Sequence, residues 1–186
     1  MKMAKYSTVL EIGVFEGETA QHLINALPKG GLYVGIDIND YRTEKTKAVM
    51  ADGGKAIEFI LGNSLTELSK LPSAHFDLIF IDADHSFGHV LQEFKLAEKL
   101  VSRGGVIILH DTIHLDGPRK LVEYAHHFGY KNITWRISLN NDKNRILGSS
   151  NPMRIDGNNY GKYLISAVVE NNEGCIDTIE FRYLEP

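Results

Sequence analysis

Carboxylate and imidazole side chains follow two apolar segments of the chain. Asp82, Asp84 and His85 come directly after "FDLIFI", and His110 with Asp111 follow "GGVIIL". Because open α/β sheets bind ligands at the carboxyl ends of their parallel strands, we expect both groups at one edge. Oxygen-rich sites suit Mg²⁺, Ca²⁺ or Mn²⁺, and an imidazole shifts the preference toward Mn²⁺ or a softer ion. The residue types at this edge therefore favour a divalent-ion site.

His85 has the intrinsic pKa that a general base needs, so His85 and Asp82 are the predicted catalytic residues. Each of these residues also has a purely structural interpretation. His85 can be an oriented but chemically idle histidine, and His110 can be a strand-end histidine bonded to a backbone carbonyl. Asp111 can be an N-cap or a turn residue.

The stretch "TVLEIGVFEGETA" ends an apolar run in a carboxylate and two glycines, Glu11, Gly13 and Gly17. The dinucleotide fingerprint GxGxxG is absent, although Asp37 stands 20 positions after Gly17, where an acid can accept hydrogen bonds from ribose hydroxyls. A carboxylate at Glu11 would repel a pyrophosphate and attract a cation. S-adenosylmethionine, which has a ribose and a sulfonium but no phosphate, fits this pattern.

The cofactor site is completed by residues near two other strand ends. Ile38 follows Asp37, and Asn63 with Ser64 could hydrogen-bond an adenine edge. Alternatively, Ser64 is the N-cap of a helix, with Glu67 completing a capping box. The glycines could likewise serve only close packing of a helix against a strand.

These residues depend on a regular alternation of strands and helices. Short apolar runs rich in β-branched residues predict central parallel strands at 8–12, 32–36, 57–61, 76–81 and 106–109. Apolar residues at helical spacing predict a helix over 87–101, which the glycines of "SRGG" would end. This order predicts an α/β domain with helices on both faces of one sheet.

The second half of the chain follows a different pattern. Pro118 could open a helix, and "NITWRISL", "YLISAVVE" and "CIDTIEFRYL" have strand composition. A polar, Asn- and Gly-rich loop near 140–161 could be a lid or a disordered segment. We expect one domain over 1–186, with a cofactor-binding half at 8–112 and an acceptor-side half at 113–186.

Composition excludes several classes of protein. The 186 residues include 43% hydrophobic and 24% charged side chains, with a net charge of −4 and no basic cluster, so nucleic acid is not the expected partner. A single cysteine, Cys175, excludes an internal disulfide and a Cys-based zinc cluster. Without an apolar run that resembles a signal peptide or membrane span, the chain is expected to be soluble and cytoplasmic.

Taken together, the motifs resemble those of class I S-adenosylmethionine-dependent methyltransferases from Thr8 to about Thr112. The motifs are "LEIGVFEGET", "VGIDIND", "GNSLTEL", "FDLIFIDADHS" and "GGVIILHDT". Within that superfamily the chain is similar to small bacterial O-methyltransferases related to metal-dependent catechol and caffeoyl-CoA O-methyltransferases, macrocin O-methyltransferase and cephalosporin hydroxylase-like proteins. The resemblance implies a Rossmann-like, seven-stranded, mostly parallel sheet with an antiparallel last strand. It also implies methylation of a small-molecule hydroxyl, with Mg²⁺ or Mn²⁺ as a second cofactor and a homo-oligomer as an option.

The resemblance also assigns roles to residues. Glu11, Gly13 and Gly17 would line the methionine and ribose side, Asp37 would hold the ribose and Asn63 would face the adenine. The residues that the resemblance implies for cofactor binding are Glu11, Gly13, Gly17, Asp37, Ile38, Asn63, Ser64 and Asp82. The metal ligands that it implies are Asp82, His110 and Asp111.

Three departures from the family pattern are visible. Asn63 replaces a common Asp, His110 replaces a carboxylate, and only seven residues precede Thr8, where relatives carry covering helices. A binding module that retains the nucleoside site without catalysis is therefore an alternative. A nicotinamide-dependent oxidoreductase is disfavoured by Glu11 and by the missing fingerprint.

Overall fold

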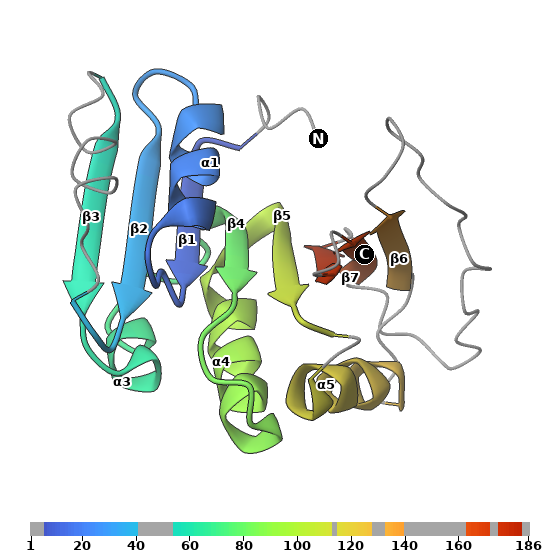
Figure 1. Cartoon of the computed structure of the whole chain (residues 1–186). Coiled ribbons are helices and arrows are strands. Elements are labelled where there is room, and N and C mark those ends of the chain that lie inside the picture. Colours follow the sequence, from blue (N-terminus) through green and yellow to red (C-terminus); the bar gives the residue numbers. More distant parts are fainter. Residues whose placement is uncertain are drawn as a thin grey trace.

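The structure of the chain is a computed structural model. It describes residues 6–40, 54–112 and 115–127 with their side chains, except that of His126, and the backbone of 133–139, 163–171 and 175–183. The predicted loop near 140–161 lies outside the described residues. Element labels follow Figure 1.

Five parallel strands form the part of the sheet that carries the site. They are β1 (Thr8–Ile12), β2 (Leu32–Asp37), β3 (Ala56–Leu61), β4 (Phe76–Ile81) and β5 (Val101–His110). Their order in space is β3-β2-β1-β4-β5, so their carboxyl ends all lie at one edge (Figure 1). The parallel, Rossmann-like α/β arrangement predicted from the apolar runs is confirmed.

Three more strands continue the sheet beyond β5. These strands are β6 (Ile133–Leu139), β7 (Tyr163–Asn171) and β8 (Cys175–Tyr183), and β8 runs antiparallel to β5. The described part of the sheet therefore has eight strands, where the resemblance implies seven. The difference arises because all three C-terminal segments with strand composition form strands.

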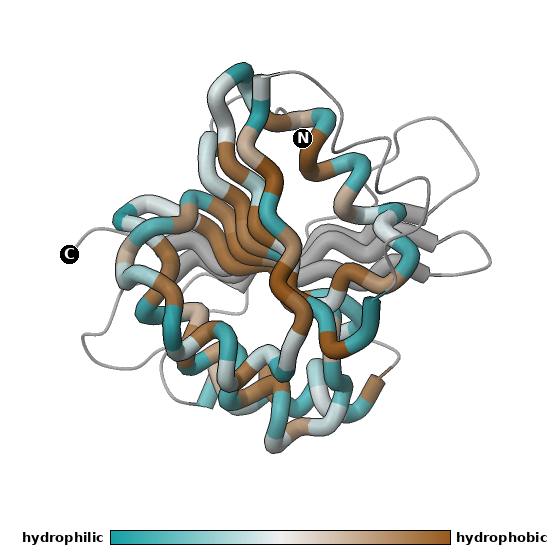
Figure 2. Tube along the Cα trace, turned by 90° about the vertical axis from the view of Figure 1, so that its left-hand side faces the viewer, coloured by the Kyte–Doolittle hydropathy of each residue, from teal (hydrophilic) through white to brown (hydrophobic). Residues whose placement is uncertain are grey.

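Helices cover both faces of the parallel strands. On one face, α1 (Glu18–Ala26) buries Ala20, Leu23 and Ile24. On the other face lie α3 (Ser64–Leu68), α4 (Phe87–Leu100) and α5 (Asp116–His127). Figure 2 shows hydrophobic strands at the centre and helices with mixed surfaces around them. The two clusters of apolar side chains hold the strand ends, and thus the site residues, in fixed positions.

Two local predictions are wrong. Helix α4 ends at Leu100, and the "SRGG" segment belongs to β5 instead of ending the helix. Val101 already has extended backbone angles, and Gly104, with φ of +75°, lies at the start of β5, where its register against β4 shifts. Strand β3 is an edge strand with partly exposed residues, not a central one.

Helix α5 begins at Asp116, two residues before the Pro118 that was expected to open it. Pro118 still lies in the first turn, where its missing N–H costs no hydrogen bond. No helix in the described part of the chain combines the length and the apolar content needed to cross a membrane.

Candidate cofactor and metal site

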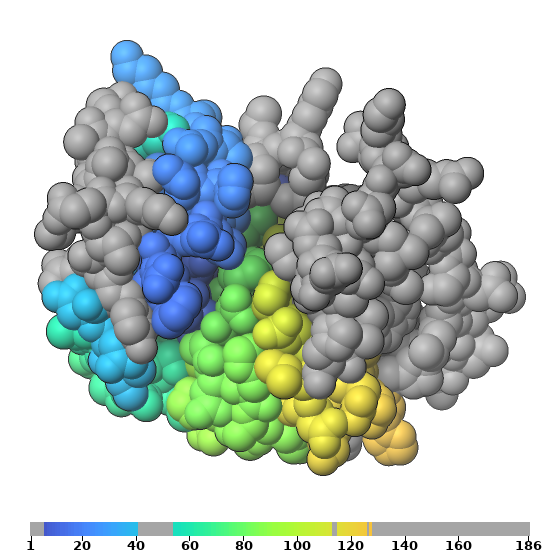
Figure 3. Space-filling view, in the orientation of Figure 1, coloured from blue at the N-terminus to red at the C-terminus, as the bar shows by residue number. Residues whose placement is uncertain are grey.

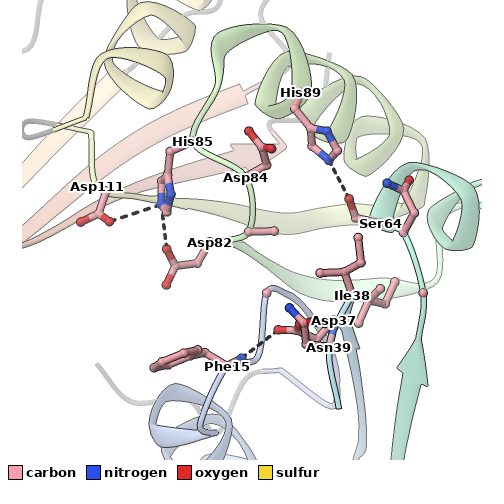
Figure 4. A pocket seen from close by; sticks show the side chains of 15 residues that line it. Phe15, Asp37, Ile38, Asn39, Ser64, Asp82, Asp84, His85, His89 and Asp111 are labelled. Atoms are coloured by element: carbon pink, nitrogen blue, oxygen red, sulfur yellow. Dashed lines mark hydrogen bonds and ion pairs between the residues drawn. The ribbon is translucent and has the colours of Figure 1, made fainter. Parts of the chain in front are cut away.

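A cleft of about 690 Å³ lies along the carboxyl edge of the parallel strands (Figure 4). The residues that line it are Gly13, Phe15, Ile36, Asp37, Ile38, Asn39, Gly62, Asn63, Ser64, Asp82, Ala83, Asp84, His85, His89 and Asp111. They end β2, follow one of the five parallel strands, or lie in the first turn of α3 or α4. The edge predicted from the spacing of the acidic motifs is therefore where they come together.

The glycine turn after β1 brings two strand ends into direct contact. Gly13 has φ of +89°, and a Cβ placed on it would lie 2.3 Å from the carbonyl oxygen of Asp82. Only glycine fits such a close approach. Gly17, with φ of +82°, is the N-cap residue of α1 and does not line the cleft. Gly13 thus lines the cleft, whereas Gly17 shapes the turn behind it.

Asp37 lies at the centre of the cleft and organises the glycine turn. Its Oδ2 accepts hydrogen bonds from the backbone N–H groups of Val14 and Phe15, both at 2.9 Å. Its Oδ1 accepts one from Asn39 at 2.9 Å. A carboxylate oxygen can accept more than one hydrogen bond, so ribose hydroxyls can still be bound. Ile38, 65% exposed, follows it along the cleft as an apolar wall.

Glu11 is not among the residues that line the cleft. It is buried on the α1 face of the sheet, where the Tyr33 hydroxyl donates a hydrogen bond to its Oε2. Burial raises the pKa of Glu11 to about 8, although the Tyr33 hydrogen bond works in the opposite direction. The same burial, together with the Glu11 carboxylate, raises the pKa of Tyr33. Glu11 therefore lies beneath the turn and does not form a pair with Asp37 around a ligand.

Asn63, and not Ser64, is the N-cap residue at the start of α3. Its Oδ1 accepts hydrogen bonds from the N–H groups of Leu65 and Thr66. The prediction of Ser64 as N-cap with Glu67 in a capping box is therefore wrong, because Ser64 is the first helical residue. Ser64 instead lines the cleft.

Three of the predicted polar residues converge at the other end of the cleft (Figure 4). His85 Nε2 lies 3.3 Å from Oδ1 of Asp82 and 3.3 Å from Oδ2 of Asp111. Each of the three offers one ligand atom within 4.8 Å of the others. Asp111 has φ of +54°, a strained angle for a residue with a side chain. Asp84 also lines the cleft, and its Oδ1 accepts a hydrogen bond from the backbone N–H of Ser86 in the loop before α4.

His110 lies directly behind this group. Its Nδ1 is 3.0 Å from Oδ1 of Asp82 and 3.2 Å from Oδ1 of Asp111, but it is buried and has no aligned hydrogen bond. The ring therefore faces carboxylates and not a backbone carbonyl. The three expected metal ligands, Asp82, His110 and Asp111, therefore lie close together, and His85 lies beside them at the cleft.

The charges of this cluster are strongly coupled. Asp111 and Asp82 raise the pKa of His85 to about 9. Burial would lower the pKa of His110, but the same two carboxylates outweigh it and raise the value to about 10. Burial would raise the pKa of Asp111, yet His110 and His85 hold it well below its ordinary range. In the metal-free protein both imidazoles are therefore protonated near neutral pH.

The donor set fits a divalent ion. Two carboxylates and an imidazole nitrogen, all within 4.8 Å of one another, match the mixed oxygen and nitrogen ligands that Mn²⁺ accepts. A protonated imidazole cannot bind a metal, so an ion would have to displace the His85 proton. Asp82, His85 and Asp111 are the residues that would hold the ion, with His110 beside them.

Two residues of α4 reach the opposite end of the cleft and were not predicted. His89 lines it, and Glu93, fully buried, accepts a hydrogen bond from the Ser64 hydroxyl and lies 3.2 Å from Nε2 of His89. The signal in the sequence was an acid inside an apolar stripe, because Glu93 stands three residues after Val90 and four before Ala97.

Helix α5 packs directly against the loop that carries His85. A Cβ placed on Gly117 would lie 1.9 Å from the carbonyl oxygen of His85. Figure 3 shows the residues of α4 and α5 adjoining on one face of the molecule. Helix α5 is thus in contact with the His85 loop through backbone atoms.

Comparison with known proteins now identifies the family. A methyltransferase domain model matches residues 10–112, which is more than half of the chain. The chain belongs to this methyltransferase family. The caffeoyl-CoA O-methyltransferase 1 of Eucalyptus globulus is 33% identical over 119 residues, covering 61% of this methyltransferase and 48% of that protein. The caffeoyl-CoA O-methyltransferase of Zinnia elegans is 32% identical over 143 residues, covering 69% and 58%.

Solved structures have the same fold as this methyltransferase. The O-methyltransferase from Bacillus cereus, solved in complex with S-adenosylhomocysteine, has a TM-score of 0.64 at 20% identity, covering 96% of this chain and 74% of that one. The O-methyltransferase TomG from Streptomyces achromogenes has a TM-score of 0.60 at 19% identity, covering 97% and 74%. The region matched by the family model, residues 10–112, includes the strands and loops that form the cleft. This methyltransferase spans about half the length of its curated plant relatives.

Proposed function

We propose that this methyltransferase is an S-adenosylmethionine-dependent O-methyltransferase that acts on a small-molecule hydroxyl, assisted by a divalent ion. The observation that carries the proposal is the shared cleft. Asp37, suited to a ribose, and the Asp82–His85–Asp111 group, suited to a cation and an acceptor, line the same space. The names of the plant and bacterial relatives support the same activity.

In this proposal the cofactor extends along the cleft from β3 toward β4. Asp37 accepts hydrogen bonds from the ribose hydroxyls, and Ile38 covers the nucleoside. Gly13 allows the close approach of the methionine part, and Asp82 adds a carboxylate beside it. Asn63 and Ser64 line the part of the cleft that would hold the adenine. Glu11 and Gly17 act from behind, through the shape and charge of the turn.

The reaction is a direct methyl transfer. The acceptor oxygen forms a bond to the methyl carbon while the carbon–sulfur bond breaks, and sulfur keeps the electron pair as a neutral thioether. When no ion is bound, the hydroxyl proton passes to His85 Nε2, which lies 3.3 Å from Oδ1 of Asp82 and must first lose its own proton. When bound, a divalent ion at Asp82 and Asp111 would supply Lewis acidity that lowers the hydroxyl pKa.

Calorimetric titration with S-adenosylhomocysteine tests the cofactor assignment. We expect saturable binding, and about 10- to 100-fold weaker binding for Asp37→Asn, because a hydrogen bond to a charged group contributes about 1.5–3 kcal/mol. Asp116→Asn, which changes an exposed acid paired with Arg119, is the control. A wild-type protein that produces no heat with the ligand at millimolar concentration would refute the proposal.

Turnover assays separate catalysis from binding alone. Catechols and sugar hydroxyls would be offered with labelled S-adenosylmethionine, with Mg²⁺, with Mn²⁺ and with a chelator. Methylated product that disappears with the chelator supports the proposal. Cofactor binding without product from any acceptor in the panel would favour the non-catalytic binding module.

Several finer points stay with this proposal as predictions. They are an antiparallel last strand in the complete domain, the division into a cofactor-binding and an acceptor-side half near residue 112, a cytoplasmic location, no nucleic-acid partner and an optional homo-oligomer.

A further inference from the structure

Four of the side chains that line the cleft are carboxylates. They belong to Asp37, Asp82, Asp84 and Asp111, which follow three different strands. None of the described residues that line the cleft is a lysine or an arginine. Because cleft walls of low dielectric focus the field of such charges, the charge of an acceptor has a direct effect on its binding.

Several described lysine and arginine residues lie at the other edge of the sheet. Lys29 and Lys55 shortly precede β2 and β3, and Arg103 is near the start of β5. Since these strands are parallel, their starts lie opposite to the cleft. Arg119, close to the start of α5, is paired with the exposed Asp116. None of these four cations lines the cleft.

One of the four carboxylates has no role in the function proposed above. Asp37 would hold the ribose, and Asp82 with Asp111 would hold the divalent ion. Asp84 is exposed and lies between His85 and His89 (Figure 4). Its Oδ1 accepts a hydrogen bond from the backbone N–H of Ser86 at 2.7 Å, so its charge is fixed beside the place of the acceptor.

The charges of the complete reaction complex can be added up, a step that rests on the proposed function. A divalent ion balances Asp82 and Asp111, and the ammonium and carboxylate of the cofactor cancel. The sulfonium balances the acceptor oxygen once that oxygen has lost its proton. The carboxylates of Asp37 and Asp84 remain, so any negative group elsewhere on the acceptor would meet like charges.

We propose that the cleft takes a hydroxyl acceptor that is cationic or uncharged and rejects anionic acceptors, with Asp84 as the residue that determines this specificity. An ammonium group on the acceptor is attracted by Asp84, whereas a carboxylate or phosphate is repelled. A coenzyme A thioester carries several phosphates and is therefore excluded. This selection separates the chain from two relatives that are named for such an acceptor.

The test compares three catechols that differ only in the charge of one substituent. They carry an aminoethyl, an ethyl or a carboxymethyl group, and each is titrated calorimetrically into the wild type saturated with S-adenosylhomocysteine and MnCl₂. At about 50 mM NaCl we expect the aminoethyl compound to bind about 10-fold or more tightly than the carboxymethyl compound, with the ethyl compound between them. At about 500 mM NaCl the ratio should fall toward one, because salt screens the charges.

Variants assign the selection to one residue through the ratio of the two dissociation constants. Asp84→Asn keeps an oxygen for the Ser86 N–H but removes the charge. It should lower the ratio about 3- to 10-fold and leave the affinity for the ethyl compound unchanged. Glu123→Gln, an exposed acid of α5 outside the cleft, should leave the ratio as it is. A purely structural role of Asp84 would weaken all three compounds equally.

A second series makes the result independent of the aromatic ring. Glucosamine, glucose and glucuronate carry the same three charges on a sugar and are titrated in the same way. A series in which the anionic member binds as tightly as the cationic one would overturn the proposal, and so would methylation of caffeoyl-CoA. Full preference in Asp84→Asn would overturn the role of Asp84.

The same titrations keep this proposal apart from the function on which it rests. Binding of S-adenosylhomocysteine without binding of any member of either series would overturn the acceptor class and leave the cofactor assignment intact. Absence of S-adenosylhomocysteine binding by the wild type would refute the methyltransferase function itself.

Discussion

His85 Nε2 lies 3.3 Å from Oδ2 of Asp111, so the loop after β4 and the end of β5 are joined by a direct ion pair. Both side chains also face Asp82, and the three donor atoms enclose a space of metal-site dimensions. Because the two carboxylates keep the His85 ring protonated near neutral pH, the ring must lose that proton before it can bind a cation or accept the proton of a hydroxyl group.

The first prediction concerns this group. Asp111→Asn removes one anionic ligand and should weaken Mn²⁺ binding about 10- to 100-fold or more, since even residues behind the ligands have effects of that size. Calorimetric titration with MnCl₂ measures it. Asp84→Asn is the matched control, because Asp84 lines the same cleft but lies outside the donor group. Equal Mn²⁺ affinity in both variants would exclude Asp111 as a ligand.

The second prediction concerns the glycine turn. Gly13→Ala should destabilise the fold by about 3 kcal/mol or more, because its Cβ would overlap the Asp82 carbonyl and φ is +89°. Gly104→Ala also has a positive φ, +75°, but meets no atom within 4 Å, and should cost only about 1 kcal/mol. Urea unfolding of the two variants gives the comparison. Similar losses would mean that the close approach adds nothing beyond backbone strain.

The third prediction concerns pH. Burial raises the pKa of Glu11 from 4.5 to about 8, so the folded protein retains a proton there that the unfolded chain releases. The contribution to the free energy of unfolding is therefore complete below about pH 4.5 and is lost as pH rises to about 8. Glu11→Gln does not titrate, so the wild type should lose about 2–4 kcal/mol relative to it across this range.

Urea unfolding of the wild type and Glu11→Gln at pH 5, 6, 7 and 8.5 measures this difference. Glu93, whose pKa is also raised, is present in both proteins and cancels in the comparison. Two stability curves that stay parallel from pH 5 to 8.5 would contradict the assignment of a buried, titrating Glu11.

The fourth prediction concerns the hydrogen bond between Tyr33 and Glu11. Tyr33→Phe leaves a buried carboxyl without its donor and should cost about 1–3 kcal/mol. In a double-mutant cycle with Glu11→Met, which removes the acceptor, the two losses should not add, because each substitution removes the same interaction. Additive losses from urea unfolding would show that the two side chains act independently.

The sequence was sufficient for features that depend on local patterns. Four of the five parallel strands begin or end within a residue or two of their apolar runs, and the motifs that follow them meet at one edge as parallel topology requires. Strand β5 begins five residues before the predicted run, because Val101 leaves the helix and its glycines are tolerated in an extended segment.

The arrangement of side chains depended on the three-dimensional structure. No local pattern shows that Glu11 points to the α1 face while Asp37 reaches the cleft, because the direction depends on strand pleat and register. Asn63 is the N-cap of α3 because its backbone is extended and its side chain reaches the N–H groups of Leu65 and Thr66. The apolar stripe of α4 indicates that Glu93 is buried, but its partner Ser64 is evident only from the structure.

The contact between Gly117 and the His85 carbonyl has a consequence for engineering. Any segment that replaces the start of α5 must arrive with glycine at this point, or it will push the His85 loop away from Asp82 and Asp111. Such an exchange would otherwise disturb three residues at the cleft, even though none of the described residues of α5 lines it.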